Sequence, residues 1–522
     1  MKHNLLMESQ ISVSSRTGQK EALSLPELFA AMARQEVARF EALRVHQSPA
    51  WHMFLVQLAA LALWPTGKDC PPADGKSWTA LLRQLTGDFA EDEPWCMIVE
   101  NPERPAFLQP PCSSGLRWKP VPTPDNLDIL NSSKNFDVKH AVGFANEPED
   151  WLYALVSVQT MAGYSGRGNH GIVRMSSGLS SRPLLGLAPG SALDRTADAS
   201  AWWARDVRRL LQGPRSSDIG TVGGPALLWC LPWKEGEKLR IPDLDPLFIE
   251  VCRRVRLTAE GAQIMAQRST SLRPRIDAGA FKGNIGDPWI PVESKRNGKS
   301  LTLGKHGFTY IRLCELLFSG DWERPVLAQH GPEETGGMVL IAEALARGRH
   351  KTEGFHARRV PIPGRAAFES GAVRSCARQQ LAEVKALAAI LRNSLAVYAA
   401  GGDWRRLKKD KSRHKLYERA QSACRRWQRH VDRVFFEALL ERVAANQKEG
   451  GGSVEDARVA FLADLLRVAR AEFARALPLM SCPSARRRAA EDRARETFRI
   501  GLRRHFPELL EQGELNGPSI EE

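Results

Sequence analysis

The chain has 522 residues, of which 43% are hydrophobic and 26% charged, so a sizeable core is available and wholesale disorder is excluded. Its formal net charge of +14 favours a polyanionic partner but carries no information about the fold. The nine cysteines include no CxxC pair, no secretory signal is visible, and the longest apolar run, residues 53–64, is too short to cross a bilayer. We therefore expect a cytoplasmic protein with reduced thiols, no cofactor, no bound metal and no membrane contact.

The first 370 residues consist of short segments separated by many Pro and Gly residues. Residues 27–44, 49–64 and 150–161 are predicted to be helices, the first of them starting just after Pro26. The apolar run 226–231 and the imperfect alternation over 248–257 predict strands. These patterns indicate an irregular, mixed α+β N-terminal domain, which we assign to residues 1–364.

A glycine-rich segment at residues 163–171 is the most informative local feature, with the sequence Gly-Tyr-Ser-Gly-Arg-Gly-Asn-His-Gly. Glycines permit positive φ and close approach to the backbone, and successive N–H groups form sites for anions. With Arg167 and His170 beside it, the segment predicts a loop that contacts nucleic acid. It also matches GxGxxG, but a dinucleotide fold needs a strand before this motif, and here a helical segment precedes it.

Residues 347–354 predict the turn of a basic β-hairpin, because Gly348 and Gly354 flank a cationic tip. Such a tip is able to wedge between base pairs or to contact phosphate. From this segment alone, an ordinary exposed loop is the simpler interpretation.

The composition changes to Ala, Leu, Arg and Glu over residues 371–510, where prolines are few. Apolar residues recur at spacings of three and four over 381–398 and 420–438, which predicts two amphipathic helices. Gly401 and Gly402 are expected to end the first, Ser453 to cap a third that stops at Pro478, and a fourth to span 484–505. We expect an antiparallel four-helix bundle over 371–510, followed by a tail at 511–522.

Positive charge is concentrated in this second part. Residues 405–429 contain eleven Lys and Arg against only Asp410 and Glu418, a net charge of +9 from eleven cations and two anions. Such a surface binds DNA or RNA through phosphate contacts, although a solvated helix face has the same composition. The candidate phosphate contacts are Arg405, Arg406, Lys408, Lys409, Lys411 and Arg413. In the fourth helix, Glu491, Asp492 and Glu496 favour a solvated face.

No catalytic motif is found: HExxH, the P-loop and the GxSxG elbow are absent, and the histidines are scattered singly. Residues 91–93 form an acidic cluster that we interpret as a solvated loop. Two alternatives stay open. One is a nucleic-acid-processing enzyme with an active site around Arg167, Asn169 and His170, and the other is a generic basic scaffold protein.

In this order, these pieces resemble the large subunit of the type I-E CRISPR Cascade, the CasA family, over most of the chain. Five blocks carry the resemblance: Asn4-Leu5-Leu6 with residues 11–13 and 23–25, the apolar segment 54–63, Pro105-Ala106-Phe107-Leu108-Gln109, the glycine loop 163–166 with Ser133-Lys134-Asn135-Phe136-Asp137 upstream, and the C-terminal bundle. The chain departs from the family in lacking the Trp-Ile-Pro of the first block and the glutamine of the hairpin tip.

The resemblance implies a non-catalytic subunit of an RNA-guided complex that recognises the PAM, starts unwinding and R-loop formation, and recruits a helicase-nuclease. The implied partners are other Cascade subunits, guide RNA through the complex, and double-stranded target DNA. The implied DNA contacts are Gly163, Tyr164, Ser165, Gly166 and Arg167 in the glycine loop, Lys134, Asn135 and Phe136 upstream, His350, Lys351 and Thr352 at the hairpin tip, and, loosely, Lys282.

Overall fold

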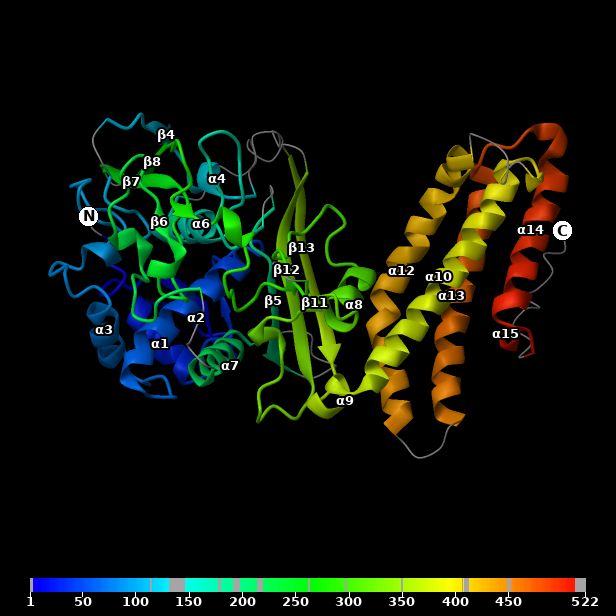
Figure 1. The fold of residues 1–522 in the computed structure, drawn as a ribbon, viewed down its shortest axis with the longest axis horizontal. Helices are drawn as coiled ribbons and strands as arrows, with labels where there is room; N and C mark the ends of the chain where they lie inside the picture. The colour runs from blue at the N-terminus through cyan, green and yellow to red at the C-terminus, as the bar shows by residue number, and fades with distance from the viewer. Residues whose placement is uncertain are drawn as a thin grey trace. The chain divides into compact units, whose positions relative to one another are not determined.

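The computed structural model describes residues 3–511 except 113–114, 131–145, 177–179, 191–197, 214–218, 262, 296–297, 349–350, 406, 408–412 and 448–451 (Figure 1). Only the backbone is described for residues 347–348, 351–352, 413, 447, 452–453 and 510–511. The chain divides into two compact units. An N-terminal unit comprises Met1–Phe308 and Glu315–Ile362, and a helical unit comprises Thr309–Cys314 and Pro363–Glu522. The assignment of Thr309–Cys314 to the helical unit has no counterpart in the predicted division into 1–364 and 371–510.

Helices form the core of the N-terminal unit. They are α1 (Leu25–Ala33), α2 (Ser48–Leu63), α3 (Gly75–Gln84), α4 (Pro124–Leu127), α6 (Pro148–Thr160) and α7 (Ala199–Gln212), while α8 (Tyr310–Phe318) is divided between the units. Helix α2 packs against α6 and α7, and every residue of α2 after Ser48 is buried. The predictions of helices at 49–64 and 150–161 are therefore confirmed.

The predicted helix over 27–44 is wrong beyond its first third. Helix α1 ends at Ala33, and Gln35 has a φ of +63°, which reverses the chain. The following residues form β3 (Arg39–Phe40), which pairs with β1 (Ile11–Ser14). Val37 is still buried, and its backbone exchanges hydrogen bonds of 3.0 and 3.1 Å with Ser200 of α7 rather than with a helical turn of its own.

Three antiparallel sheets complete the N-terminal unit. They have the orders β2–β1–β3, β13–β12–β5 and β4–β8–β7, with β2 (Lys20–Leu23), β5 (Leu184–Pro189), β12 (Met338–Gly348), β13 (Lys351–Ile362), β4 (Lys119–Val121), β7 (Arg254–Glu260) and β8 (Gln263–Ser269). Two smaller pairs are β6 (Leu239–Arg240) with β9 (Ile276–Asp277), and β10 (Val292–Glu293) with β11 (Trp322–Glu323). The hairpin expected around residues 347–354 is confirmed as β12–β13 (Figure 1).

Both other strand predictions need correction. Residues 226–231 contain a 3₁₀ turn, Leu228–Cys230, and make only an isolated bridge from Leu227 to Ile249. Prolines at 225 and 232 cannot donate to a ladder, which limits pairing here. The alternation over 248–257 becomes a strand only from Arg254 onward.

The helical unit contains α10 (Gly371–Ala399), α12 (Arg413–Gln447), α13 (Gly452–Leu479) and α14 (Arg487–His505), with the short helices α9 (Arg365–Glu369) and α15 (Glu508–Glu511). Helix α10 packs against α12, α13 and α14, and α12 packs against α13. The α+β fold with a C-terminal helical bundle is thus confirmed. Gly401 and Gly402, both at positive φ, follow the end of α10 as expected. Ser453 is not a cap, because α13 begins one residue earlier.

Across the described part of the chain, none of the helices combines the length and the apolar character needed to cross a bilayer.

Candidate nucleic-acid interface

The glycine loop, residues 163–171, follows directly after helix α6. The Ser165 N–H donates to the Asn169 carbonyl and the Asn169 N–H donates to the Gly166 carbonyl, both at 3.0 Å, which closes a tight turn. Gly166 and Gly168 have φ values of +106° and +78°, which side-chain-bearing residues rarely adopt. Because a helix precedes the loop, the segment is not the strand–turn–helix of a dinucleotide site.

Close packing fixes the shape of this loop. A Cβ atom placed on Gly168 would lie 2.7 Å from the Cβ of Thr270, and one on Gly171 would lie 2.5 Å from the backbone nitrogen of Tyr164. Glycine is therefore required for space at 171, and for both space and φ at 168.

The base of the loop is anchored on both legs. The Gly163 carbonyl accepts a hydrogen bond of 2.6 Å from Nη2 of buried Arg253. On the other leg, the Ile172 N–H donates to the Ala162 carbonyl at 3.0 Å. The loop thus extends from a closed stem.

The top of the loop faces solvent. Tyr164, Ser165 and Arg167 are exposed, whereas Gly163 is buried and Gly166 half-buried. Three of the five predicted contact residues in the loop therefore present side chains to an approaching molecule.

The chain that follows strand β8 lies against the glycine loop. The Ser271 N–H donates to the Gly168 carbonyl at 3.0 Å. Arg268 and Arg273, both exposed, are three and two residues away from Ser271 along the chain, so this contact brings their segment to the loop. Between them Leu272 is 82% exposed. Sequence reasoning missed these residues, because only the pairing of distant segments brings them to the loop.

Like charges face each other across this sheet. Lys119 on β4 stands directly opposite Arg268 on β8, and both side chains are exposed. Like charges at directly opposed positions destabilise a sheet. We call Lys119, Arg167, Arg268 and Arg273 the basic rim. Within the described residues, none of these four has an ion-pair partner.

Lys282 is exposed and has a φ of +51°. The next residue, Gly283, packs against the backbone just past the glycine loop: a Cβ there would lie 2.4 Å from the carbonyl carbon of Met175. Lys282 is therefore held beside the segment that follows the loop, although no contact joins it to residues 163–171.

Other predicted contacts are only partly described. Lys134, Asn135, Phe136 and His350 lie outside the described residues, and Lys351 and Thr352 start strand β13 with only their backbones described. The hairpin is nevertheless linked to the loop stem. Ser181 exchanges hydrogen bonds of 2.9 and 2.7 Å with Leu345 of β12, and the Arg182 N–H donates to the Met161 carbonyl at 2.9 Å.

A buried charge cluster lies behind the glycine loop, and sequence analysis did not predict it. It comprises Arg174, Arg182, Glu250 and Asp287, all less than 9% exposed. Oε1 of Glu250 accepts a 2.8 Å hydrogen bond from the Val173 N–H, two residues after the loop ends. Asp287 accepts from Nε of Arg182 at 2.9 Å and from Nη1 of Arg174 at 3.4 Å.

Burial dominates the ionisation of this cluster. It raises the pKa of Glu250 to about 7, despite the opposing effect of Arg174. It lowers the pKa of Arg182 to about 10, although Asp287 acts in the other direction. A carboxyl group with a pKa near 7 thus accepts a hydrogen bond from the chain just after the loop.

Arg167, Asn169 and His170, the residues of the enzyme alternative, do lie together, but no oriented base is found. Nε2 of His170 is buried with no hydrogen-bond partner among the described residues, and its ring packs at 6.5 Å from that of Tyr164. Nor do three His, Cys, Asp or Glu side chains in the described part of the chain gather so as to hold a metal ion.

The acidic cluster at residues 91–93 is not a solvated loop, which corrects the prediction. Asp92 and Glu93 are buried. Asp92 pairs with Nη2 of Arg83 at 2.8 Å, and Glu93 pairs with Arg104. The arginine partners are separated from the carboxylates in sequence, so spacing alone did not reveal them.

The basic stretch at the start of the bundle is described in part. Arg405 is exposed, Arg413 begins α12 with only its backbone described, and Arg406, Lys408, Lys409 and Lys411 lie outside the described residues.

Farther along α12, four exposed cations form what we call the α12 basic stripe: Lys415, Arg419, Arg425 and Arg429. No carboxylate pairs with any of them within the described residues. Two of their spacings are i,i+4, where like charges repel. By contrast, Arg426 pairs with Glu472 at 2.5 Å, and on α14 Arg495 pairs with Glu491 and Arg499 with Glu496. The solvated-face interpretation thus fits those α14 residues but not the stripe.

The family model and the solved structures that match this chain agree with one another. A family model described as CRISPR-associated protein Cse1 matches residues 4–471. Among solved structures, Cse1 from Acidimicrobium ferrooxidans is similar at 14% identity and a TM-score of 0.67, covering 98% of this chain and 99% of that one. CasA (Cse1) of Thermus thermophilus is similar at 17% identity and a TM-score of 0.62, covering 96% and 99%.

A chain from a structure described as a CRISPR RNA-guided surveillance complex is similar at 14% identity and a TM-score of 0.60, covering 95% of this chain and 99% of that one. No curated protein matches. At these identities, the structural similarities establish the fold.

Proposed function

The chain belongs to the Cse1 family, the large (CasA) subunits of the type I-E CRISPR Cascade, and we propose that it recognises the PAM in double-stranded DNA and starts the unwinding that leads to an R-loop. In such complexes, guide pairing reads the target sequence while protein reads the short PAM.

The observation that carries this proposal is the closely packed glycine loop, beside which lie cations that have no ion-pair partner among the described residues. Its stem is anchored by Arg253, and its top exposes Tyr164, Ser165 and Arg167. Nothing lies within 4 Å of a Cβ built on Gly166, so at this position the loop backbone is open to close approach by a DNA groove. We assign phosphate contacts to the basic rim, because the hydrogen bond from Ser271 to Gly168 joins the chain that follows β8 to the glycine loop.

We assign supporting roles to the other predicted contacts. Lys134, Asn135 and Phe136 would insert beside the PAM, His350, Lys351 and Thr352 would separate the first base pairs, and Lys282 would approach from the segment packed on Met175. The α12 basic stripe, with Arg405, Arg406, Lys408, Lys409, Lys411 and Arg413, would hold displaced single-stranded DNA by phosphate contact.

In this account the chain is a non-catalytic subunit that acts in the cytoplasm. It assembles with other Cascade subunits and guide RNA, and it recruits a helicase-nuclease. A related chain forms part of a structure described as an RNA-guided surveillance complex, which supports the assembly.

The test is target-duplex binding by a guide-RNA complex assembled with and without this chain, at fixed moderate salt, over a series of permuted PAM sequences. We expect the chain to add affinity for a subset of PAMs. An increase that is equal for every PAM would leave only a basic scaffold, the alternative without PAM recognition.

The enzyme alternative is tested in the same preparation. The isolated chain is incubated with DNA and RNA, and products are followed for the parent and for His170→Ala. We expect no strand cleavage or base modification by either. A product that is formed by the parent and lost in His170→Ala would replace the proposal by the enzyme.

A further inference from the structure

Leu272 is 82% exposed, more than any other large apolar side chain in the described part of the chain. It lies in the short connection between strands β8 and β9, one residue after Ser271, whose N–H donates to the Gly168 carbonyl of the glycine loop. A leucine held in water forgoes the free energy that its burial would provide. Phosphate contacts by the basic rim and backbone contacts by the loop give this side chain no role.

The backbone around Leu272 is anchored to distant segments. The Leu272 N–H donates to Oε1 of Glu235 at 2.8 Å, and Oε2 of Glu235 lies 3.3 Å from Nη2 of buried Arg254. Three residues farther along, the buried side chain of Arg275 donates to the Leu228 carbonyl at 2.6 Å. The exposed leucine is therefore presented from a connection that is fixed on both sides.

Cations lie close to Leu272. Arg273 is the next residue, Arg268 is four residues earlier, and both side chains are exposed. Exposed Arg167 directly precedes Gly168, the residue that contacts this segment. The carboxylate that holds the Leu272 N–H, that of Glu235, is already paired with Arg254. The local excess of positive charge favours a polyanion as the molecule that covers the leucine.

A single leucine among cations fits a nucleic acid better than a protein partner. The centre of a protein interface is depleted of charged residues and enriched in aromatic ones. Apart from Leu272, the only large apolar side chain exposed on the described glycine loop or on residues 268–273 is Tyr164, at 43%. Proteins that bind the minor groove insert single apolar side chains, leucine among them, between base pairs, while neighbouring basic residues hold the DNA.

We propose that Leu272 inserts from the minor groove between two adjacent base pairs at or beside the PAM and unstacks them, while Arg268 and Arg273 contact the flanking phosphates. The inference rests on the proposed function, because the glycine loop must lie against the same duplex. It adds a way of reading sequence without base-edge contacts. Pyrimidine–purine steps unstack easily, so they are favoured over stiff steps at the point of insertion.

The first test detects the unstacking itself. The complex assembled with guide RNA is bound to a duplex that carries the preferred PAM but no complementarity to the guide, so that guide pairing does not unwind it. The adenine analogue 2-aminopurine, which fluoresces more strongly when unstacked, is placed at each position of the PAM and its neighbours in turn. We expect a rise at one step for the parent, its loss in Leu272→Ser, and its retention in Leu272→Met.

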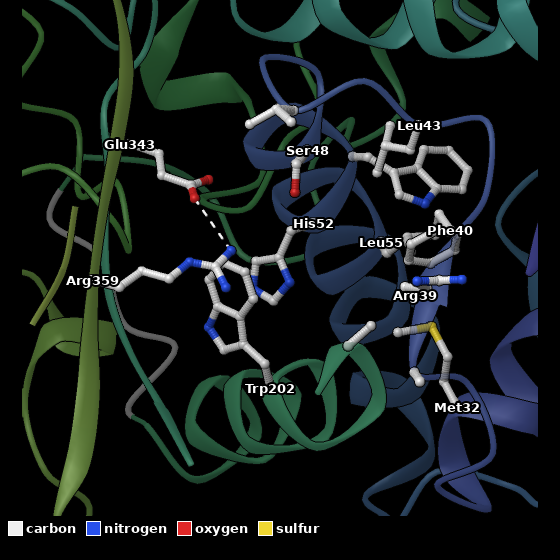
Figure 2. A pocket seen from close by; sticks show the side chains of 14 residues that line it. Met32, Arg39, Phe40, Leu43, Ser48, His52, Leu55, Trp202, Glu343 and Arg359 are labelled. Atoms are coloured by element: carbon white, nitrogen blue, oxygen red, sulfur yellow. Dashed lines mark ion pairs between the residues drawn. The ribbon is translucent and has the colours of Figure 1, made fainter. Parts of the chain in front are cut away.

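Val45→Ser is the matched control, because it removes another exposed apolar side chain of the N-terminal unit. Val45 is 70% exposed and lines the pocket shown in Figure 2, which no residue of the glycine loop or the basic rim lines. We expect this variant to give the parent's fluorescence, and both serine variants to keep the parent's Tm. A rise that persists unchanged in Leu272→Ser would overturn the proposal.

The second test measures the preference for an easily unstacked step. A pyrimidine–purine step and a stiff step are compared at the position where the fluorescence rises. We expect the parent to bind the first duplex about fivefold more tightly, and Leu272→Ser to reduce this ratio to about one. On the favoured duplex, Leu272→Ser is expected to bind about tenfold more weakly than the parent. Equal step preference in parent and variant would contradict the insertion.

The outcomes separate this inference from the proposed function. A parent complex without PAM preference would refute both. PAM preference that is present in the parent, with Leu272→Ser equal to the parent in fluorescence and affinity, would leave the proposed function intact and make Leu272 an ordinary exposed side chain. Failure of Leu272→Ser, but not of Val45→Ser, to assemble into the complex before DNA is added would identify a protein contact and overturn the inference.

Discussion

The glycine loop and the α12 basic stripe both present cations without acidic partners among the described residues, but the two regions hold them differently. In the loop, positive-φ glycines, close packing on Thr270 and the anchor from Arg253 fix a backbone shape. In the stripe, exposed side chains at helical spacing supply charge with little fixed geometry. Under the proposed function, we therefore assign discrimination between sequences to the loop and sequence-independent affinity to the stripe.

The loop also depends on buried ionisable groups, which the stripe does not, and this gives the largest expected effect. Glu250 is buried, its pKa is raised to about 7, and it accepts from the Val173 N–H. Because the folded state holds this proton more tightly than the unfolded state, the contribution of Glu250 to stability is greatest below its ordinary pKa and is lost as the pH rises to about 7.

We therefore expect Glu250→Gln to gain stability relative to the parent by roughly 3 kcal/mol between about pH 4.5 and 7. Urea unfolding of both chains across this pH range measures the difference. A difference that stays constant with pH would show that Glu250 does not titrate in the folded chain.

Distorting the loop should remove discrimination. In Gly168→Ala, the new Cβ meets Thr270 and the φ of +78° is strained, so the loop must move. We expect about a 30-fold loss of affinity for the preferred PAM and little change for the others, measured by duplex binding of the assembled complex.

Gly18→Ala is the matched control, because Gly18 has a φ of +84° but no atom within 4 Å of a built Cβ. If both alanine variants lose PAM preference equally, backbone strain in general rather than the loop is responsible.

Neutralising the stripe should act on every target alike. Replacing Lys415, Arg419, Arg425 and Arg429 by Gln is expected to weaken binding about tenfold for all PAMs and to make it less dependent on salt. The same substitutions relieve two i,i+4 repulsions, so the Tm should not fall. Arg495→Gln with Arg499→Gln on α14, where both arginines are paired, is the control and should leave affinity unchanged.

The smallest effect is expected at the basic rim. Lys119→Gln removes the repulsion with Arg268 across the sheet, so stability should rise by a few tenths of a kcal/mol, while duplex affinity falls about threefold. Thermal unfolding and duplex titration of one preparation measure both changes. A loss of stability together with affinity would indicate that Lys119 is a structural residue.

Sequence patterning was sufficient to predict a helix where the segment's own residues determine which of its faces are buried. Helix α2 is apolar on all sides and was predicted nearly to its ends. The bundle helices α10 and α12 were predicted by their spacing, but both extend beyond the predicted ranges 381–398 and 420–438. The β12–β13 hairpin was indicated by Gly348, at the end of β12, and by Gly354, which the structure places within β13 opposite Ala346. The end of α1 was missed, since a left-handed Gln35 gives no compositional signal.

The candidate site was predictable only in its local part. The glycine loop is evident in the sequence, but Arg268 and Arg273 reach it through the hydrogen bond between Ser271 and Gly168. The buried charge cluster joins four residues between positions 174 and 287, and burial rather than residue type sets its ionisation. Such pairings depend on register and tertiary packing, which spacing along one chain does not encode.

The most direct test of the central claim is photo-crosslinking from the top of the glycine loop. Ser165, which is exposed, is replaced by p-benzoylphenylalanine in a complex assembled with guide RNA and a bound target duplex, and the crosslinked nucleotides are mapped. The account predicts crosslinks confined to the PAM base pairs and their immediate neighbours. Crosslinks only elsewhere in the duplex, or none from a fully bound complex, would contradict it.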